Sequence, residues 1–350
     1  TGTDSGAIYP IYGDIDTSTT TSLSTADLIL NGEHANDNAG TALASAGDVD
    51  GDGFMDLLVG APYNDDAAGN TGKAYLVTGQ DMITAGSSAS LSIAHHGFLG
   101  ESVNDLAGSA VASAGDVDGD GLPDLLIGAT GDDDGGSNAG KAYLVLASTV
   151  AGLGSNPSLA DADYYFYGEA AADGAGAALA GVGDIDGDGL DDFMVGASGN
   201  DDAGASAGKA YLLLGSSLSA SMSLSGADSI FTGAAEGDLL GHVVANAGDV
   251  DFDGFGDALI GAPGQDMGGT DAGASYLLLG ATLRAGTASY DMGDTVFDYQ
   301  FMGDTTSNYA GWAAGTAGDV NGDGFSDLLF GAYGYSSERG RAYLALSPGE

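Results

Sequence analysis

One string of residues occurs five times along the chain, at nearly constant spacing. The string AGDVDGDGFMDLLVGAP starts at Ala46, and related strings start at Ala114, Val182, Ala247 and Ala317. The first Asp of each copy follows the previous one by 68, 68, 65 and 70 residues, so five periods fill nearly all of the 350 residues. This repetition indicates that each copy is one supersecondary unit, which buries its apolar face by packing against its neighbours.

Each repeat contains four short apolar or alternating runs. In the second repeat, run A is SAVASAGDV (109–117), run B is DLLIGAT (124–130) and run C is KAYLVL (141–146). Run D precedes the next copy, as in SLSIAHHGF (90–98). Such runs, bounded by Gly, Asp and Ser and without a helical period, predict an all-β fold. Four strands in each radially repeated unit predict the blades of a β-propeller. A β-solenoid is the alternative, but its coils are usually much shorter.

Between run A and run B, every repeat places oxygen-bearing side chains at one spacing, Asp-x-Asp-x-Asp-Gly-x-x-Asp. Ca²⁺ takes six to eight oxygen ligands, whereas Mg²⁺ prefers fewer protein ligands in strict octahedral geometry. An EF-hand would need Glu at position 12, where the first repeat has Val59. We therefore predict about five Ca²⁺ ions, one per repeat, bound by side chains at positions 1, 3, 5 and 9 and by the backbone carbonyl at position 7.

The predicted calcium loops are residues 48–56, 116–124, 184–192, 249–257 and 319–327. Their predicted ligands are Asp48, Asp50, Asp52, Phe54, Asp56, Asp116, Asp118, Asp120, Leu122, Asp124, Asp184, Asp186, Asp188, Leu190, Asp192, Asp249, Asp251, Asp253, Phe255, Asp257, Asp319, Asn321, Asp323, Phe325 and Asp327. Asn321 carries no charge, so we expect weaker binding in the fifth loop. Five sites, each at ten times its Kd, would add about 7 kcal/mol to the folding stability.

The composition excludes several classes of protein. The chain has 51 acidic and 6 basic residues, for a net charge of -45, which argues against binding to nucleic acid or to an anionic membrane surface. Without Cys it has no disulfide, thiolate zinc site or cysteine nucleophile. It has no run of about 18 apolar residues that would insert into a membrane. It starts at Thr without a signal-peptide pattern, which we interpret as a mature or excised form.

The repeats resemble FG-GAP repeats, the units of the β-propeller of integrin α subunits and of integrin-like bacterial surface proteins. The resemblance rests on DVDGDGFMDLLVGAP and its four relatives, each followed by a strand such as GKAYLV, and it covers about residues 24–346. It implies blades that each carry a calcium loop between the inner strand A and strand B. It also implies an extracellular, secreted or cell-surface setting and a role in adhesion or ligand binding. Propellers of this family are usually seven-bladed, whereas this chain has five loops.

The two ends of the chain leave the closure of the propeller open. We predict an extra N-terminal strand and a Ser/Thr-rich linker over 1–23, and the propeller over 24–350. The fifth blade lacks a D strand, ADLILNGE (26–33) is a D strand without a blade, and GAIYPIYG (6–13) resembles a surplus C strand. Three arrangements fit: a ring in which 26–33 completes the fifth blade and 7–13 decorates its exterior, an arc of a longer propeller, or subunits joined by terminal strand exchange.

Other candidate sites are weaker. A basic residue precedes Ala-Tyr in four C strands, and we expect it to pair with a carboxylate. The Glu that recurs after run D is a candidate for that partner. The acidic clusters that follow run B are expected to be solvated turns, with extra cation sites at one rim as the alternative. The match to G-x-S-x-G at 204–208 lies in a small-residue loop without a strand-to-helix turn, so we expect no nucleophile and no enzyme. The less regular aromatic residues are a candidate sugar- or protein-binding face: Tyr63, Tyr164, Tyr165, Tyr309, Trp312, Tyr333 and Tyr335.

We therefore expect a non-enzymatic, calcium-stabilised extracellular β-propeller that binds a protein or glycan at a cell surface or in a matrix. One alternative is a structural subunit of an extracellular filament, joined by terminal strand exchange. Another is an accessory propeller domain of a secreted enzyme, because a similar propeller accompanies a phospholipase in one branch of the family.

Overall fold

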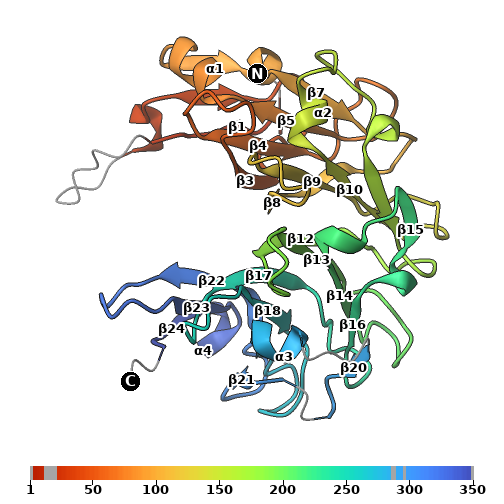
Figure 1. Ribbon diagram of the computed structural model, residues 1–350, viewed down its shortest axis with the longest axis vertical. Helices are drawn as coiled ribbons and strands as arrows, with labels where there is room; N and C mark the ends of the chain where they lie inside the picture. The colour runs from red at the N-terminus through yellow and green to blue at the C-terminus, as the bar shows by residue number, and fades with distance from the viewer. Residues whose placement is uncertain (1–2, 12–21, 285–288, 295–296, 348–350) are drawn as a thin grey trace.

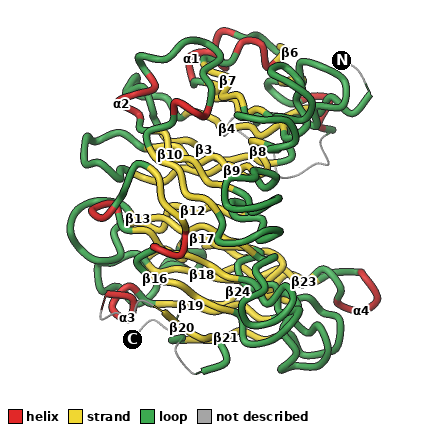
Figure 2. The backbone as a smooth tube through the Cα atoms, turned by 90° about the vertical axis from the view of Figure 1, so that its right-hand side faces the viewer, coloured by secondary structure: helices red, strands yellow, loops and turns green. Residues whose placement is uncertain are grey.

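The computed structural model describes residues 3–11, 22–284, 289–294 and 297–347. Its sheets follow one another around an open arc, with the inner strand of each blade toward the centre (Figure 1). Figure 2 shows the same blades stacked in chain order from β4 and β7 at one end to β21 at the other. The all-β architecture of propeller-type blades agrees with the prediction.

Four blades are complete, and each is an antiparallel sheet of strands A, B, C and D. Blade 1 contains β3 (Ala42–Gly47), β4 (Asp56–Ala61), β5 (Lys73–Val77) and β7 (His96–Leu99). Blade 2 contains β8 (Ala107–Gly115), β9 (Asp124–Ala129), β10 (Lys141–Val145) and β11 (Tyr164–Tyr167). Blade 3 contains β12 (Ala178–Gly183), β13 (Asp192–Ala197), β14 (Lys209–Leu213) and β16 (Ser229–Thr232). Blade 4 contains β17 (Val243–Gly248), β18 (Asp257–Ala262), β19 (Ala274–Leu278) and β21 (Tyr299–Met302).

Two partial sheets stand at the ends of the arc (Figure 1). Blade 5 contains β22 (Ala310–Gly318), β23 (Asp327–Ala332) and β24 (Arg341–Ala345). The N-terminal sheet contains β1 (Ala7–Ile8), β2 (Ile29–Asn31) and β6 (Ser88–Ser90).

Short helices and extra strands connect the C and D strands. The α-helices are α1 (Gly79–Thr84), α2 (Ala147–Val150), α3 (Gly280–Arg284) and α4 (Tyr335–Glu338), the last of which lies between β23 and β24. Single 3-10 turns occur at Leu23–Thr25, Leu91–Ile93, Leu159–Asp161, Gly215–Ser217 and Leu224–Gly226. Three connections add a parallel strand to the D strand of the preceding sheet: β6 on β2, β15 (Ser221–Ser223) on β11, and β20 (Ser289–Asp291) on β16.

The core lies between neighbouring blades. The C-strand tyrosines Tyr75, Tyr143, Tyr211 and Tyr276 are at most 1% exposed and belong to this core. Close approach of successive blades requires Gly in strand B. A Cβ on Gly128 would lie 2.1 Å from the carbonyl oxygen of Gly176 in the next blade, so any larger residue would force the blades apart.

The N-terminal strands do not close a ring. β2 pairs with β1 and β6, whereas within the described residues β24 pairs with β23 alone. Of the three arrangements that the sequence left open, the ring in which 26–33 completes blade 5 is therefore wrong. The Gly32 N–H donates to the Gly6 carbonyl at 3.0 Å, as Gly100 does to Gly72 at 3.1 Å, so 3–8 and 28–39 form the outer half of a sixth unit. Residues 12 and 13 of the proposed surplus strand lie outside the described residues.

Candidate metal centres

Each predicted calcium loop joins strand A to strand B and begins just after a β-bulge. In blade 1 the register shifts between Ser45 and Gly47, and Gly47 has a φ of +82°, a conformation that favours Gly. The Asp48 carboxylate then accepts the N–H groups of Asp52 and Gly53 at 3.0 and 2.9 Å, and Asp50 accepts Asp52 N–H at 3.1 Å. These bonds curl the backbone around the carboxylates at positions 1 and 3.

The Asp at position 9 also ties the loop to the C strand of its own blade. Asp56 is 2% exposed, and its two oxygens accept Val49 N–H and Gly79 N–H, each at 2.8 Å. Gly79 is the first residue of α1, so the carboxylate lies at the N-terminal end of the helix that follows strand C. The same two bonds recur, at 2.7 to 2.9 Å, for Asp124, Asp192, Asp257 and Asp327.

Three carboxylates converge in each of the first four loops. The side chains at positions 1, 3 and 9 bring one oxygen each within 4.8 Å of one another. These groups are Asp48–Asp50–Asp56, Asp116–Asp118–Asp124, Asp184–Asp186–Asp192 and Asp249–Asp251–Asp257. The clusters form at the edge of the arc that also carries α1, α2 and α3 (Figure 2).

The electrostatics of these clusters favour the uptake of a cation or a proton. The pKa of Asp124, Asp192 and Asp257 is raised to about 7, mainly by burial and also by the neighbouring loop carboxylates, against the lowering effect of the two backbone N–H bonds. The pKa of Asp56 is raised for the same reasons. A bound divalent cation would remove this repulsion, and its hard-oxygen donor set is the one that Ca²⁺ prefers.

The remaining predicted ligands do not belong to these three-carboxylate groups. The position 5 carboxylates Asp52, Asp120, Asp188 and Asp253 stand outside the four three-carboxylate groups, and each accepts the N–H of the residue at position 7. In the fifth loop the Asn321 amide donates to Asp323 at 2.8 Å. The whole ligand assignment, including the position 7 carbonyls of Phe54, Leu122, Leu190, Phe255 and Phe325, stays a prediction.

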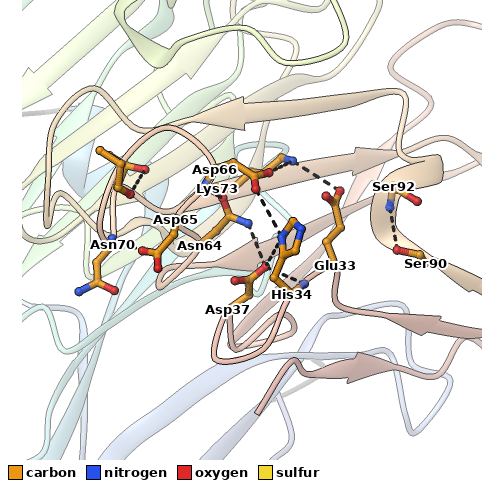
Figure 3. A network of polar contacts seen from close by, with 12 residues as sticks. Glu33, His34, Asp37, Asn64, Asp65, Asp66, Asn70, Lys73, Ser90 and Ser92 are labelled. Atoms are coloured by element: carbon orange, nitrogen blue, oxygen red, sulfur yellow. Dashed lines mark hydrogen bonds and ion pairs between the residues drawn. The ribbon is translucent and has the colours of Figure 1, made fainter. Parts of the chain in front are cut away.

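A buried lysine cluster, rather than a second metal site, connects the acidic loops after strand B. Lys73 is 3% exposed, and its Nζ lies 2.8 Å from Asp66 and 3.5 Å from Glu33 (Figure 3). The side chains of Glu33, His34 and Asp66 also approach one another, but the Lys73 ammonium already pairs with both carboxylates. Lys141 and Lys209 make the same contacts with Glu101 and Asp134, and with Glu169 and Asp202.

The fourth repeat replaces this cluster as a unit. Ala274 stands at the lysine position, Ala234 at the Glu position and Met267 at the Asp position. In the fifth repeat, Arg341 lies over the ring of Tyr335, 3.4 Å from its centroid, rather than following the lysine pattern. The expected pairing of the C-strand lysines with a carboxylate is confirmed for Lys73, Lys141 and Lys209.

The structure brings together three of the proposed face-forming aromatic residues. Tyr309 stacks on Tyr333 with ring centroids 5.0 Å apart, and Trp312 meets Tyr333 edge-on at 4.6 Å. His242 of blade 4 joins them at 4.2 Å from Trp312, which sequence analysis missed although both residues stand at the first position of run A. Tyr164 and Tyr165 lie instead on β11 of blade 2. Within the described residues, no helix is long and apolar enough to cross a membrane.

Comparison with known proteins identifies the repeat. The FG-GAP repeat model matches residues 39–77, 107–145, 175–213, 240–278 and 310–344, more than half of the chain. Integrin alpha-5 of Xenopus laevis is 36% identical over 111 residues, which are 31% of this chain and 10% of that protein. Integrin alpha-7 of Rattus norvegicus is 32% identical over 171 residues, 49% of this chain and 14% of that protein.

A protein that is not an integrin is also similar to this chain. Phosphatidylinositol-glycan-specific phospholipase D of Bos taurus is 36% identical over 126 residues, which are 34% of this chain and 14% of that protein. The chain therefore spans only a small part of the curated relatives that it matches. The five matched segments each run from strand A through a carboxylate loop to strand C, and on these grounds the chain belongs to the FG-GAP repeat family, with integrin α-like propeller blades.

Proposed function

We propose that the five loops bind Ca²⁺ and that the calcium-loaded blades form a non-enzymatic, extracellular ligand-binding module. The convergence of three carboxylates in each of four loops, one of them fully buried, carries this proposal. Two or three anionic oxygens within 4.8 Å repel one another unless a cation or proton lies between them. Ca²⁺ accepts such oxygens together with backbone carbonyls and waters in flexible geometry.

Calcium would stabilise the blades as well as the loops. The buried Asp at position 9 bonds both to its own loop and to the residue after strand C, so the state of the loop is transmitted to three strands of the blade. At free calcium ten times above Kd, each site would contribute about 1.4 kcal/mol to the free energy of unfolding.

Thermal unfolding in 5 mM Ca²⁺, in 5 mM Mg²⁺ and in excess chelator tests the calcium proposal. We expect the highest Tm in Ca²⁺, a smaller effect of Mg²⁺ and the lowest Tm in chelator. A variant with Asp118→Asn and Asp186→Asn should lose part of the calcium effect, whereas the exposed Asp161→Asn should keep all of it. Equal Tm values in Ca²⁺ and chelator would refute the proposal.

The similarity to integrin α subunits supports a role in extracellular adhesion or ligand binding, and the aromatic cluster of blade 5 is the best-placed candidate face. Trp312 and Tyr333 are 43% and 45% exposed, whereas the first repeat has Thr41 and Pro62 at these positions. Flat, exposed aromatic rings present an apolar surface with polar edges, and the net charge of -45 disfavours anionic ligands.

Binding of the calcium-loaded protein to an array of neutral and amino-containing glycans tests this face. We expect Trp312→Ala to weaken binding at least tenfold, because it removes the exposed ring. Tyr63→Ala is the matched control, since Tyr63 is 44% exposed in blade 1 and lies outside the cluster. Equal loss in both variants, or none in either, would contradict this assignment without affecting the calcium proposal.

A further inference from the structure

The outer face of blade 5 exposes apolar residues that the other blades bury. Val320, Leu329 and Leu344 are 52%, 45% and 51% exposed. At the same three repeat positions, blades 1 to 4 have residues that are at most 7% exposed: Val49, Val117, Ile185, Val250, Leu58, Leu126, Met194, Leu259, Leu76, Leu144, Leu212 and Leu277. In blades 1 to 4 this face is covered by the next blade, so in blade 5 it is an uncovered blade-to-blade interface, called here the C face.

The opposite end of the arc exposes the complementary interface. Leu43, Phe54 and Met55 of blade 1 are 51%, 46% and 63% exposed. The residues at the Phe54 and Met55 positions in the later blades are all partly covered. Beside them lies a groove of about 610 Å³, lined by residues of blade 1 and of the segment at 8–11. We call this surface the N face. It borders the place of strands A and B in the half-formed N-terminal unit.

Internal junctions show how the two faces fit. At the junction of blades 2 and 3, a Cβ on Gly115 would lie 2.1 Å from Asp191, and the Asp191 N–H donates to the Asp116 carbonyl at 2.9 Å. Asp191 is the residue at the Met55 position of the repeat. At Gly318, the blade 5 counterpart of Gly115, nothing lies within 4 Å. In blade 1, Met55 therefore projects from the position that packs on a glycine at internal junctions. In blade 5, Gly318 leaves the space that such a residue would fill.

The strands at the two ends are also incomplete in complementary ways. In the complete blades the C and D strands pair over four positions, as from Lys73 opposite Leu99 to Leu76 opposite His96. β24 is a five-residue C strand without a D strand in the described part of the chain. β2 is a D strand whose C-strand partner, β1, pairs at only two positions and is followed by Pro10, which has no N–H to continue the ladder.

We propose that copies of this chain associate head to tail, with the C face of one copy on the N face of the next. Strands β22 and β23 of one copy take the places of strands A and B, and β24 replaces β1 on β2 of the other copy. The register of the complete blades then places Arg341 opposite Asn31 of the second copy. Such an interface joins two different surfaces, so it builds rings or open filaments. It rests on strand packing and not on the proposed ligand binding.

Complementation between two blocked variants tests the polarity of this assembly. The protein is studied by light scattering in 5 mM Ca²⁺ and about 0.5 M salt, which screens the repulsion between copies. We expect the unmodified chain to assemble with rising concentration. Met55→Asp blocks the N face and Leu329→Asp the C face, so each variant alone should be monomeric and their mixture should form dimers only. Val103→Asp, at an exposed site away from both ends, should assemble normally.

The absence of Cys from the chain allows a direct test of strand exchange. Asn31→Cys and Arg341→Cys variants, mixed and oxidised, should form a covalent heterodimer, because directly opposed residues in antiparallel strands bring Cβ atoms within disulfide range. Arg341→Cys mixed with Val103→Cys should not. A monomer at all concentrations would overturn the proposal, and so would dimers in each single variant. Assembly without the specific cross-link would overturn the exchange of β24 for β1.

Discussion

Asparagine at position 124 should change the stability of the protein in opposite directions with and without calcium. Asp124 is fully buried, accepts N–H groups from Val117 and Ala147, and lies beside the carboxylates of Asp116 and Asp118. In the metal-free protein, the rise in its pKa from 3.8 to about 7 means that ionisation at pH 8 costs up to ~4 kcal/mol. Asp124→Asn removes this charge and keeps one carbonyl oxygen.

The net effect follows from two opposing contributions. Losing one of the two backbone bonds costs ~1–3 kcal/mol, so the metal-free variant at pH 8 should gain ~1–3 kcal/mol and its Tm should rise by ~1–4 °C. In calcium at about a thousand times Kd, the unmodified chain gains ~4.1 kcal/mol from the ion in loop 2, which the variant does not bind. The variant is then ~1–3 kcal/mol less stable than the unmodified chain, and its Tm should fall by ~1–4 °C.

Differential scanning calorimetry at pH 8, in calcium and after calcium removal, measures the direction of both Tm shifts. Asp161→Asn makes the same charge change at an exposed position and should shift the Tm by less than ~1 °C in either condition. A fall of equal size with and without calcium would show that Asp124 serves only as a backbone hydrogen-bond acceptor, and the reasoning would be refuted.

Three further predictions follow from the same contacts. The pKa values of Asp124, Asp192 and Asp257 are raised to about 7 in the fold and are near 3.8 in the unfolded chain, so between these values the folded metal-free chain binds more protons. Its free energy of unfolding should therefore rise as the pH falls from about 7 to 5, by at most ~1.4 kcal/mol per carboxyl per pH unit, and its Tm should rise as well. Calcium-loaded protein should show no such rise, and a flat metal-free profile would contradict this. Lys141→Met should cost ~3–5 kcal/mol in urea unfolding by leaving the buried Asp132 carboxylate without its cation, whereas also introducing the blade 4 residues (Glu101→Ala, Asp132→Gln, Asp134→Met) should restore most of it; equal stability of the single and multiple variants would disprove this. Gly115→Ala should destabilise the protein more than Gly318→Ala, since both glycines have positive φ but only Gly115 faces the next blade; equal losses of Tm would show that backbone strain alone matters.

The carboxylate-rich loops and the central strands could be predicted because the same string of residues occurs five times in the sequence. Strands B and C carry continuous apolar runs that are buried on both faces, and the Gly-rich loops between A and B turn at fixed positions. The second role of Asp56 could not be predicted, since its bond to Gly79 joins residues 23 apart that only the folded hairpin brings together.

The ends of the arc were harder to predict. The pairing of β1 with β2 lies in a unit that contributes no calcium loop to the chain, so the repeated string does not reveal it. The parallel strands β6, β15 and β20 are only three residues long, too short for a pattern of alternation to stand out, and their position depends on the D strand of the preceding sheet. Closure of the ring depends on how far each blade rotates from the last, which the pattern of apolar residues within one blade does not encode.

A count of bound calcium tests the central claim most directly. Equilibrium dialysis against a calcium series, read by atomic emission, should give five ions per chain, with the loop that contains Asn321 filling last. Asp116→Asn combined with Asp118→Asn should lower the count by one. No bound calcium at millimolar concentration, or a count that these two substitutions leave unchanged, would contradict the assignment of the loops as metal centres.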